Sequence, residues 1–147
     1  MTFTEKQGDL FDVPEEYFLA HCISADFGMG AGIVVEFNRR FDMKRVLKAK
    51  YPNYLSEWTA NSMKCGCIPE GRVFNLITKK LVFHKPTYDS LKGSLELMRD
   101  LCAEKGITKL AMPRIGCGID GLKWERVSAI IREVFADTDI EILVCVL

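Results

Sequence analysis

Short runs of consecutive apolar residues alternate along this chain with stretches in which apolar residues recur at helical spacing. Residues 3–7 predict a short opening strand that turns at Gly8-Asp9, and the runs at residues 18–22, 109–112 and 140–146 predict further strands. The last run is almost continuously apolar, which is typical of a strand covered on both faces of a sheet. Residues 64–68 and 73–78 predict a hairpin that turns at Pro69-Glu70-Gly71.

Three stretches predict amphipathic helices. The first follows the glycine-rich residues 28–32 and has four apolar positions at helical spacing, Ile33, Val34, Phe37 and Phe41. The second begins near the N-cap Thr87 and ends at Gly106. Its inner face is expected to carry Leu91, Leu95, Met98 and Cys102. The third covers residues 124–135, with Val127, Ile130, Ile131 and Val134 inward. Residues 42–62 predict irregular or helical surface.

Strands and helices alternate, so the chain predicts an α/β fold with a mixed sheet of about six strands between helices. The length of 147 residues fits a single domain, residues 1–147, and no internal repeat or linker divides it. In sheets of this class ligands bind beyond the carboxyl ends of the strands.

The charge balance and the cysteines indicate which partners and which cellular compartment to expect. Lysine plus arginine equals aspartate plus glutamate, at 20 each, which argues against a broad nucleic-acid or membrane surface. No signal segment opens the chain and no run is long enough to span a bilayer. The six cysteines lie mostly in apolar runs, and Cys65-Gly66-Cys67 is too tight for a zinc knuckle. We expect a reduced, cytoplasmic protein without metal or cofactor, or a nuclear one in a eukaryote.

Two glycine-bearing stretches carry the chemistry. The first is His21-Cys22-Ile23-Ser24 followed by Met29-Gly30-Ala31-Gly32-Ile33, and the second runs from Met112 to Leu122. Each follows a predicted strand and leads into a predicted helix, so each can direct backbone N–H groups at an anion. Neither is a dinucleotide fingerprint or a P-loop. One such loop can simply be a tight helix entry, but two favour a ligand with two phosphates.

Four segments resemble the macrodomain family, and in particular its branch of terminal ADP-ribose protein glycohydrolases. They read LAHCISADFGMGAGI (residues 19–33), LITKK (76–80), HKPTY (84–88) and MPRIGCGIDGLKWE (112–125). The resemblance runs from about Gly8 to the C-terminus. It implies a three-layer α/β/α sandwich. The first loop lacks the asparagine and the longer glycine run of the commoner branches, which favours the lysine-dependent branch.

The resemblance also implies a role for each site residue. Asp9 and Leu10 would sit against adenine, and the chain end at Leu147 would lie close to the ligand. The second loop would wrap the diphosphate and the distal ribose through Arg114, Ile115, Gly116, Cys117, Gly118, Ile119 and Asp120. The first loop would close the other side through His21, Ser24, Met29, Gly30, Ala31 and Gly32. Lys79 matches the nucleophile and Asp120 its acid/base partner.

The chemistry of an amine agrees with these two roles. A neutral amine can attack C1″ of the distal ribose and expel a carboxylate, after which the ring-opened sugar gives a Schiff-base-type adduct. A lysine amine ordinarily has a pKa of roughly 10.4, so the reaction needs burial or a neighbouring cation to make it neutral. A carboxylate can move the protons and let water release the sugar. The resemblance implies a metal-independent hydrolase that acts as a monomer. Its implied substrate is ADP-ribose ester-linked to acidic side chains of proteins. O-acetyl-ADP-ribose and ADP-ribosylated nucleic acid are further possible substrates.

Each of these residues also has a structural interpretation that involves no catalysis or ligand binding. A lysine at a strand end is usually a solvated charge, an aspartate after a glycine turn is usually a helix cap, and His21 in an apolar run reads as a core histidine. Cys117 is not preferred as a nucleophile because no base is placed for it. The family often has an aromatic residue where this chain has Cys145, which implies either a lower affinity for adenine or a stacking ring supplied by Phe11 or Tyr17.

Two other functions stay open at this point. The first is a module that binds ADP-ribose without cleaving it, since a fold alone does not decide between reading and cleaving. The second is a magnesium-dependent nucleotide hydrolase, although the sequence has no acidic cluster suited to that metal.

Overall fold

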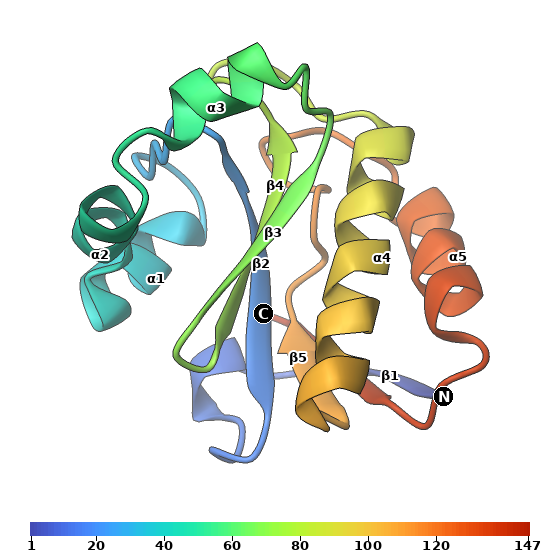
Figure 1. Cartoon of the computed structure of the whole chain (residues 1–147). Coiled ribbons are helices and arrows are strands. Elements are labelled where there is room, and N and C mark those ends of the chain that lie inside the picture. Colours follow the sequence, from blue (N-terminus) through green and yellow to red (C-terminus); the bar gives the residue numbers. More distant parts are fainter.

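A six-stranded sheet lies between two layers of helices in the computed structural model, which describes residues 1–147 (Figure 1). The strands are β1 (Thr2–Gln7), β2 (Phe18–Ser24), β3 (Gly66–Glu70), β4 (Val73–Lys79), β5 (Lys109–Met112) and β6 (Glu141–Val146). The helices are α1 (Val34–Phe41), α2 (Met43–Lys50), α3 (Tyr54–Ala60), α4 (Tyr88–Lys105) and α5 (Trp124–Phe135), with a short 3-10 turn η1 (Leu10–Asp12). The α/β class and the mixed six-stranded sheet are therefore confirmed.

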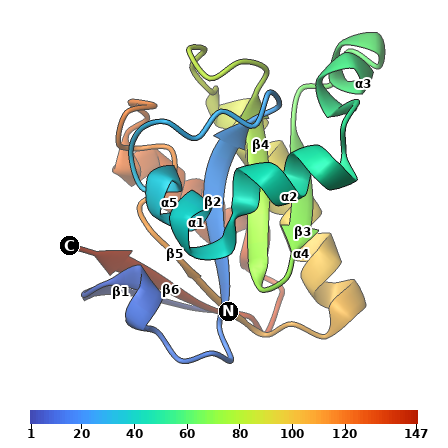
Figure 2. The same ribbon diagram turned by 90° about the vertical axis from the view of Figure 1, so that its left-hand side faces the viewer.

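The strand order is β1-β6-β5-β2-β4-β3, and every neighbouring pair is parallel except β3 and β4. The carboxyl ends of β2, β4 and β5 consequently face the same edge of the sheet. The loops that follow these three strands emerge together there, in both views (Figures 1 and 2). Segments far apart in the sequence thus meet beyond that edge.

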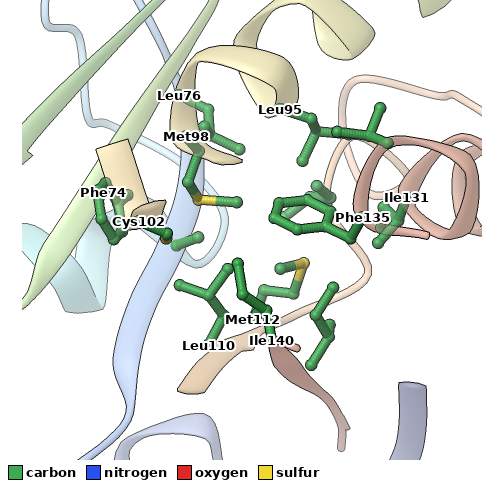
Figure 3. Close-up of a cluster of buried hydrophobic side chains, with 14 of the residues drawn as sticks. Phe74, Leu76, Leu95, Met98, Cys102, Leu110, Met112, Ile131, Phe135 and Ile140 are labelled. Atoms are coloured by element: carbon green, nitrogen blue, oxygen red, sulfur yellow. The ribbon is translucent and has the colours of Figure 1, made fainter. Parts of the chain in front are cut away.

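Each face of the sheet has its own buried core. Helices α4 and α5 cover one face, and α1, α2 and α3 cover the other (Figure 1). The close-up in Figure 3 shows the first core, in which Leu95 and Met98 of α4 meet Phe135 of α5 and Leu76 of β4. The second core gathers Phe37, Leu47 and Trp58 from the three shorter helices. The parallel strands β2, β4, β5 and β6 lie between the two cores and are covered on both sides, which explains their apolar runs, whereas the edge strand β1 is mostly exposed.

Local signals set the ends of α4 as the sequence predicts. The Thr87 hydroxyl accepts from the backbone N–H of Ser90, and the Ser90 hydroxyl accepts from that of Thr87. This reciprocal capping box satisfies two N–H groups that the first helical turn leaves free. Gly106 ends the helix in the left-handed conformation, with φ of +69°.

The predicted hairpin turn is wrong by two residues. Pro69 and Glu70 belong to β3, and the turn consists of Gly71 and Arg72. A proline fits there because β3 is the edge strand, so the missing N–H costs no hydrogen bond within the sheet. The stretch 42–62 is helical, since it forms α2 and α3. No helix has both the length and the apolar character required to cross a membrane.

Candidate functional site

A cavity of about 360 Å³ lies between the two glycine-bearing loops, beyond the carboxyl ends of β2, β4 and β5. Eleven of the residues proposed from the sequence line it: Ser24, Gly30, Ala31, Gly32, Lys79, Arg114, Ile115, Gly116, Gly118, Ile119 and Asp120. The two stretches, which lie far apart in the sequence, are therefore two walls of one pocket.

Lys79 and Asp120 meet at this cavity. The Lys79 amine donates to Oδ1 of Asp120 over 2.7 Å, and the two side chains are only 10% and 15% exposed. Lys79 is the last residue of β4, and Asp120 comes from the loop between β5 and α5. An amine and a carboxylate in contact within a sheltered cavity can exchange a proton without solvent between them.

An irregularity in β4 sets the direction of the Lys79 side chain. Ile23 of β2 pairs with Ile77, but the next residue, Ser24, pairs with Lys79. Thr78 is therefore an extra residue in β4, and its buried hydroxyl has no hydrogen-bond partner. One-residue bulges of this kind are frequent beside active sites because they re-aim a side chain.

The glycines of the two loops allow close approach of the backbone. Gly32 has φ of +78°, and a Cβ there would lie 3.3 Å from Cδ1 of Ile119, so the two loops touch across the cavity. Gly116 has φ of +73°, and a Cβ there would lie 3.0 Å from Cδ1 of Leu122. Both positions favour glycine for conformation and for space.

Arg114 lies at the rim and is held in place by its neighbours. Its guanidinium donates twice to Oε1 of Glu5, at 3.1 and 3.2 Å, and lies 5.6 Å from the ring centre of Trp124. The indole N–H of Trp124 donates to the same carboxylate oxygen over 3.0 Å. The positive charge at this wall of the cavity is thus fixed by a carboxylate and an aromatic ring.

The His21 and Met29 side chains do not reach the cavity. His21 is fully buried, its ring stacks on Phe37 with 3.8 Å between the ring centres, and Nε2 lies 2.6 Å from Oδ1 of Asn75. Burial lowers the pKa of His21 to about 4, against the opposing effect of the bond to Asn75. His21 is therefore a core histidine, which was the plainer of its two interpretations. Met29 is 5% exposed and belongs to the second core.

The residues expected near adenine form a separate group outside the cavity lining. Asp9 caps η1 by accepting from the backbone N–H of Phe11 over 2.9 Å. Leu10 is buried in the second core together with Cys145, while the chain end at Leu147 is 91% exposed. These residues follow β1 and β6, so they lie at the same edge of the sheet as the cavity.

The cysteines near the site are protonated thiols. Burial, with a smaller contribution from the Asp120 carboxylate, raises the pKa of Cys22, which lines the cavity. Burial also raises the pKa of Cys117, against the opposing charge of Arg114. Cys117 does not line the cavity, and its thiol donates to the backbone oxygen of Ile115. A protonated thiol is a poor nucleophile, so neither residue competes with the amine of Lys79.

Sequence reasoning missed part of the lining. The added residues are Cys22, Ile23, Gly28, Ile33, Val34, Val82 and Pro113. Most of them are immediate neighbours of proposed residues and could have been included on that ground. Val82 could not, because it enters the wall only through the turn that follows Lys79.

A second hollow of about 560 Å³ opens at the opposite edge of the sheet, where β2 and β5 begin. Its charged groups include Glu16 and Lys109, which pair with each other at 3.0 Å. It lies at the amino ends of these strands, whereas ligands of α/β sheets bind at the carboxyl ends. The chain has no cluster of three or more histidine, cysteine, aspartate or glutamate side chains suited to a metal.

This chain belongs to the Macro domain family, whose model matches residues 47–131. It is 47% identical over 142 residues to the ADP-ribose glycohydrolase OARD1 of Homo sapiens and to that of Bos taurus. Each match covers 96% of this chain and 89% of the relative. The family expected from the four motifs is therefore confirmed.

Solved structures share the fold at low sequence identity. The macrodomain of DarG from Thermus aquaticus matches with a TM-score of 0.76 and 23% identity, over 100% of this chain and 99% of that one. The DarTG protein of Thermosipho africanus, solved in complex with ADP-ribose, matches with a TM-score of 0.71 and 16% identity, over 98% of this chain and 41% of that one. These likenesses confirm the macrodomain architecture.

Proposed function

We propose that this protein is an ADP-ribose glycohydrolase that releases ADP-ribose from ester-linked acidic side chains, with Lys79 as nucleophile and Asp120 as acid/base. The contact between the Lys79 amine and the Asp120 carboxylate carries the proposal, because a module that only binds ADP-ribose needs neither group. The 47% identity to ADP-ribose glycohydrolases over nearly the whole chain supports it.

The reaction begins when Asp120 accepts a proton from the Lys79 ammonium. The neutral amine forms a bond to C1″ of the distal ribose while the bond from C1″ to the carboxylate oxygen breaks. Asp120 passes the proton it has taken to the departing carboxylate and becomes a carboxylate again. The ribose ring then opens as a proton moves from the lysine nitrogen to O4″ and the C1″–N double bond forms. The Asp120 carboxylate deprotonates water, which adds to C1″, and it returns this proton to the lysine nitrogen as the C1″–N bond breaks, which releases the lysine and ADP-ribose. The net change is hydrolysis of one bond.

The two loops bind the ligand in this proposal. Backbone N–H groups around Gly30 and Gly116 face the diphosphate, and Arg114 adds positive charge at the rim. Asp9 and Leu10 lie further along the same edge and would receive the adenine. All of these groups come from one chain, so we propose that the protein acts as a monomer on ADP-ribosylated proteins.

Label release from a glutamate-linked ADP-ribosylated protein tests the proposal. We expect release by the wild type, in the presence of EDTA as well, and a loss of at least about 100-fold in Lys79→Ala. Mass spectrometry of the wild type with ADP-ribose should find an adduct on Lys79. Equal release by wild type and Lys79→Ala would refute the lysine mechanism. Tight binding of ADP-ribose without release by either would show a binding module.

The same assay compares the alternative linkages. O-acetyl-ADP-ribose and an ADP-ribosylated oligonucleotide present the same C1″-bearing ribose to the Lys79 amine with different groups attached. Their rates relative to the glutamate-linked substrate rank the substrates of the enzyme. We expect the ester of the acidic side chain to be fastest, because the charge balance of the chain does not favour nucleic acid.

A further inference from the structure

The direction of the Lys79 side chain depends on the extra residue in β4. Side chains alternate between the two faces of a strand, so a slip of one residue would turn Lys79 toward α4 and away from the cavity. The register therefore has to be held where Thr78 interrupts it. Pairing with β3 ends at Ile77 and does not extend to Lys79.

The segment after β2 holds the end of β4 from one side. The backbone N–H of Ala25 donates to the Lys79 oxygen over 2.9 Å, and that of Asp26 donates to the Lys80 oxygen over 3.2 Å. The Asp26 side chain reaches further along. Its Oδ2 accepts from the backbone N–H of Val82 over 3.0 Å, and its Oδ1 accepts from that of Gly28 over 3.1 Å and from the Ser24 hydroxyl.

One carboxylate thus joins the first glycine loop to the turn after Lys79. This turn has little packing of its own, because Val82 is 47% and Phe83 75% exposed. Val82 instead lies against Gly28, where an added Cβ would come within 2.8 Å of its own Cβ. Gly28 and Val82 both line the cavity, so Asp26 fixes the wall next to the reactive amine.

Helix α4 holds the same segment from the other side. The Ser94 hydroxyl, which is fully buried, donates to the backbone oxygen of Ile77 over 2.9 Å. The Ser90 hydroxyl donates to the backbone oxygen of Thr78 over 2.8 Å. Ser90 also takes part in the capping box of α4, whereas the Ser94 hydroxyl has no other hydrogen bond. Together the two serines bind the carbonyl groups of Ile77 and Thr78, where the irregularity lies.

We propose that Asp26 is a positioning residue for Lys79, holding the bulged end of β4 so that the amine meets Asp120. This inference rests on the proposed function and adds to it a residue that touches no reacting atom. An asparagine cannot replace Asp26, although it has the same shape. Both carboxylate oxygens accept from backbone N–H groups, so either orientation of an amide sets its NH₂ against one of them.

The experiment measures kcat and the affinity for ADP-ribose separately in Asp26→Asn. We expect kcat to fall on the order of 10- to 100-fold, the loss that a displacement of about 1 Å can cause, with Kd changed by less than about threefold. The adduct at Lys79 should form more slowly by the same factor. Asp42→Asn is the matched control, because Asp42 is exposed and pairs only with Arg45.

Ser94→Ala tests the same geometry from α4, with Ser128→Ala as its control, because the half-buried Ser128 donates only to Glu125 within its own helix. It serves in place of Asp26→Asn if that variant does not fold. Equal losses in kcat and affinity, or wild-type kcat in both variants, would overturn the inference. If Lys79→Ala keeps full activity, the proposed function itself fails. If Lys79→Ala is inactive while Asp26→Asn is unchanged, only the role of Asp26 fails.

Discussion

The buried histidine makes the stability of this protein depend on pH in a calculable way. His21 is fully buried, and its Nε2 lies against Oδ1 of Asn75. The Asn75 amide nitrogen donates to the backbone oxygen of Ile68 over 3.1 Å, which assigns Oδ1 as the acceptor and places the imidazole proton on Nε2. Nδ1 has no hydrogen-bond partner. A second proton there would have no acceptor, so the folded protein resists protonation.

The size of the effect follows from the two pKa values. Burial lowers the pKa of His21 from 6.5 to about 4 in the folded chain. Between these values the unfolded chain binds a proton that the folded chain does not, so acid favours unfolding. The contribution of the neutral His21 to the free energy of unfolding is fully present above about pH 6.5 and is lost as the pH falls toward 4. At about pH 5 the free energy of unfolding is lower by about 2 kcal/mol, at ~1.4 kcal/mol per pH unit.

Urea unfolding at about pH 8 and about pH 5, followed by tryptophan fluorescence, measures this loss. The His21→Gln variant can still donate to Asn75 but does not titrate, so its decrease between the two pH values should be about 2 kcal/mol smaller than that of the wild type. His84→Gln is the control, because His84 is the only other histidine and is exposed. Equal decreases in wild type and His21→Gln would refute the reasoning.

Three further predictions concern packing and backbone conformation. Leu95→Ala removes a fully buried side chain between α4 and the sheet, so urea unfolding should show a loss of about 3 kcal/mol. Gly106→Ala meets no steric contact but must adopt φ of +69°, so its melting temperature should fall in line with a cost of about 1 kcal/mol. Gly28→Ala brings a Cβ within 2.8 Å of the Val82 Cβ, so one of the two segments must move, and urea unfolding should show a loss of about 1–3 kcal/mol.

Much of the fold could be predicted because its signals are local. Thr87 and Gly106 mark the two ends of α4 by side-chain chemistry and conformation that a few neighbours decide. The apolar run of β6 reflects coverage on both faces. The turn after β3 was misplaced because Pro69 is tolerated only at the edge of a sheet, and the strand order that makes β3 an edge is a long-range property.

Eleven residues of the cavity lining could be proposed from the sequence, but their geometry could not. The resemblance to macrodomains supplied Lys79 and Asp120, while their 2.7 Å contact spans 41 positions of the chain and needs the folded sheet. The extra residue at Thr78 has no signal in the sequence, since β4 contains neither glycine nor proline to mark it. The roles of Asp26 and Ser94 depend on backbone groups far away in the sequence, at Val82 in the turn after β4 and at Ile77 within β4.

Between β4 and β5 the sheet contains β2, a strand from the first quarter of the chain. The amine and the carboxylate therefore sit on opposite flanks of a strand made long before either of them during synthesis. No contiguous fragment beginning after β2 can bring the two groups together, however well its own helices form. Activity should therefore require the complete sheet and should be lost in the first cooperative unfolding step.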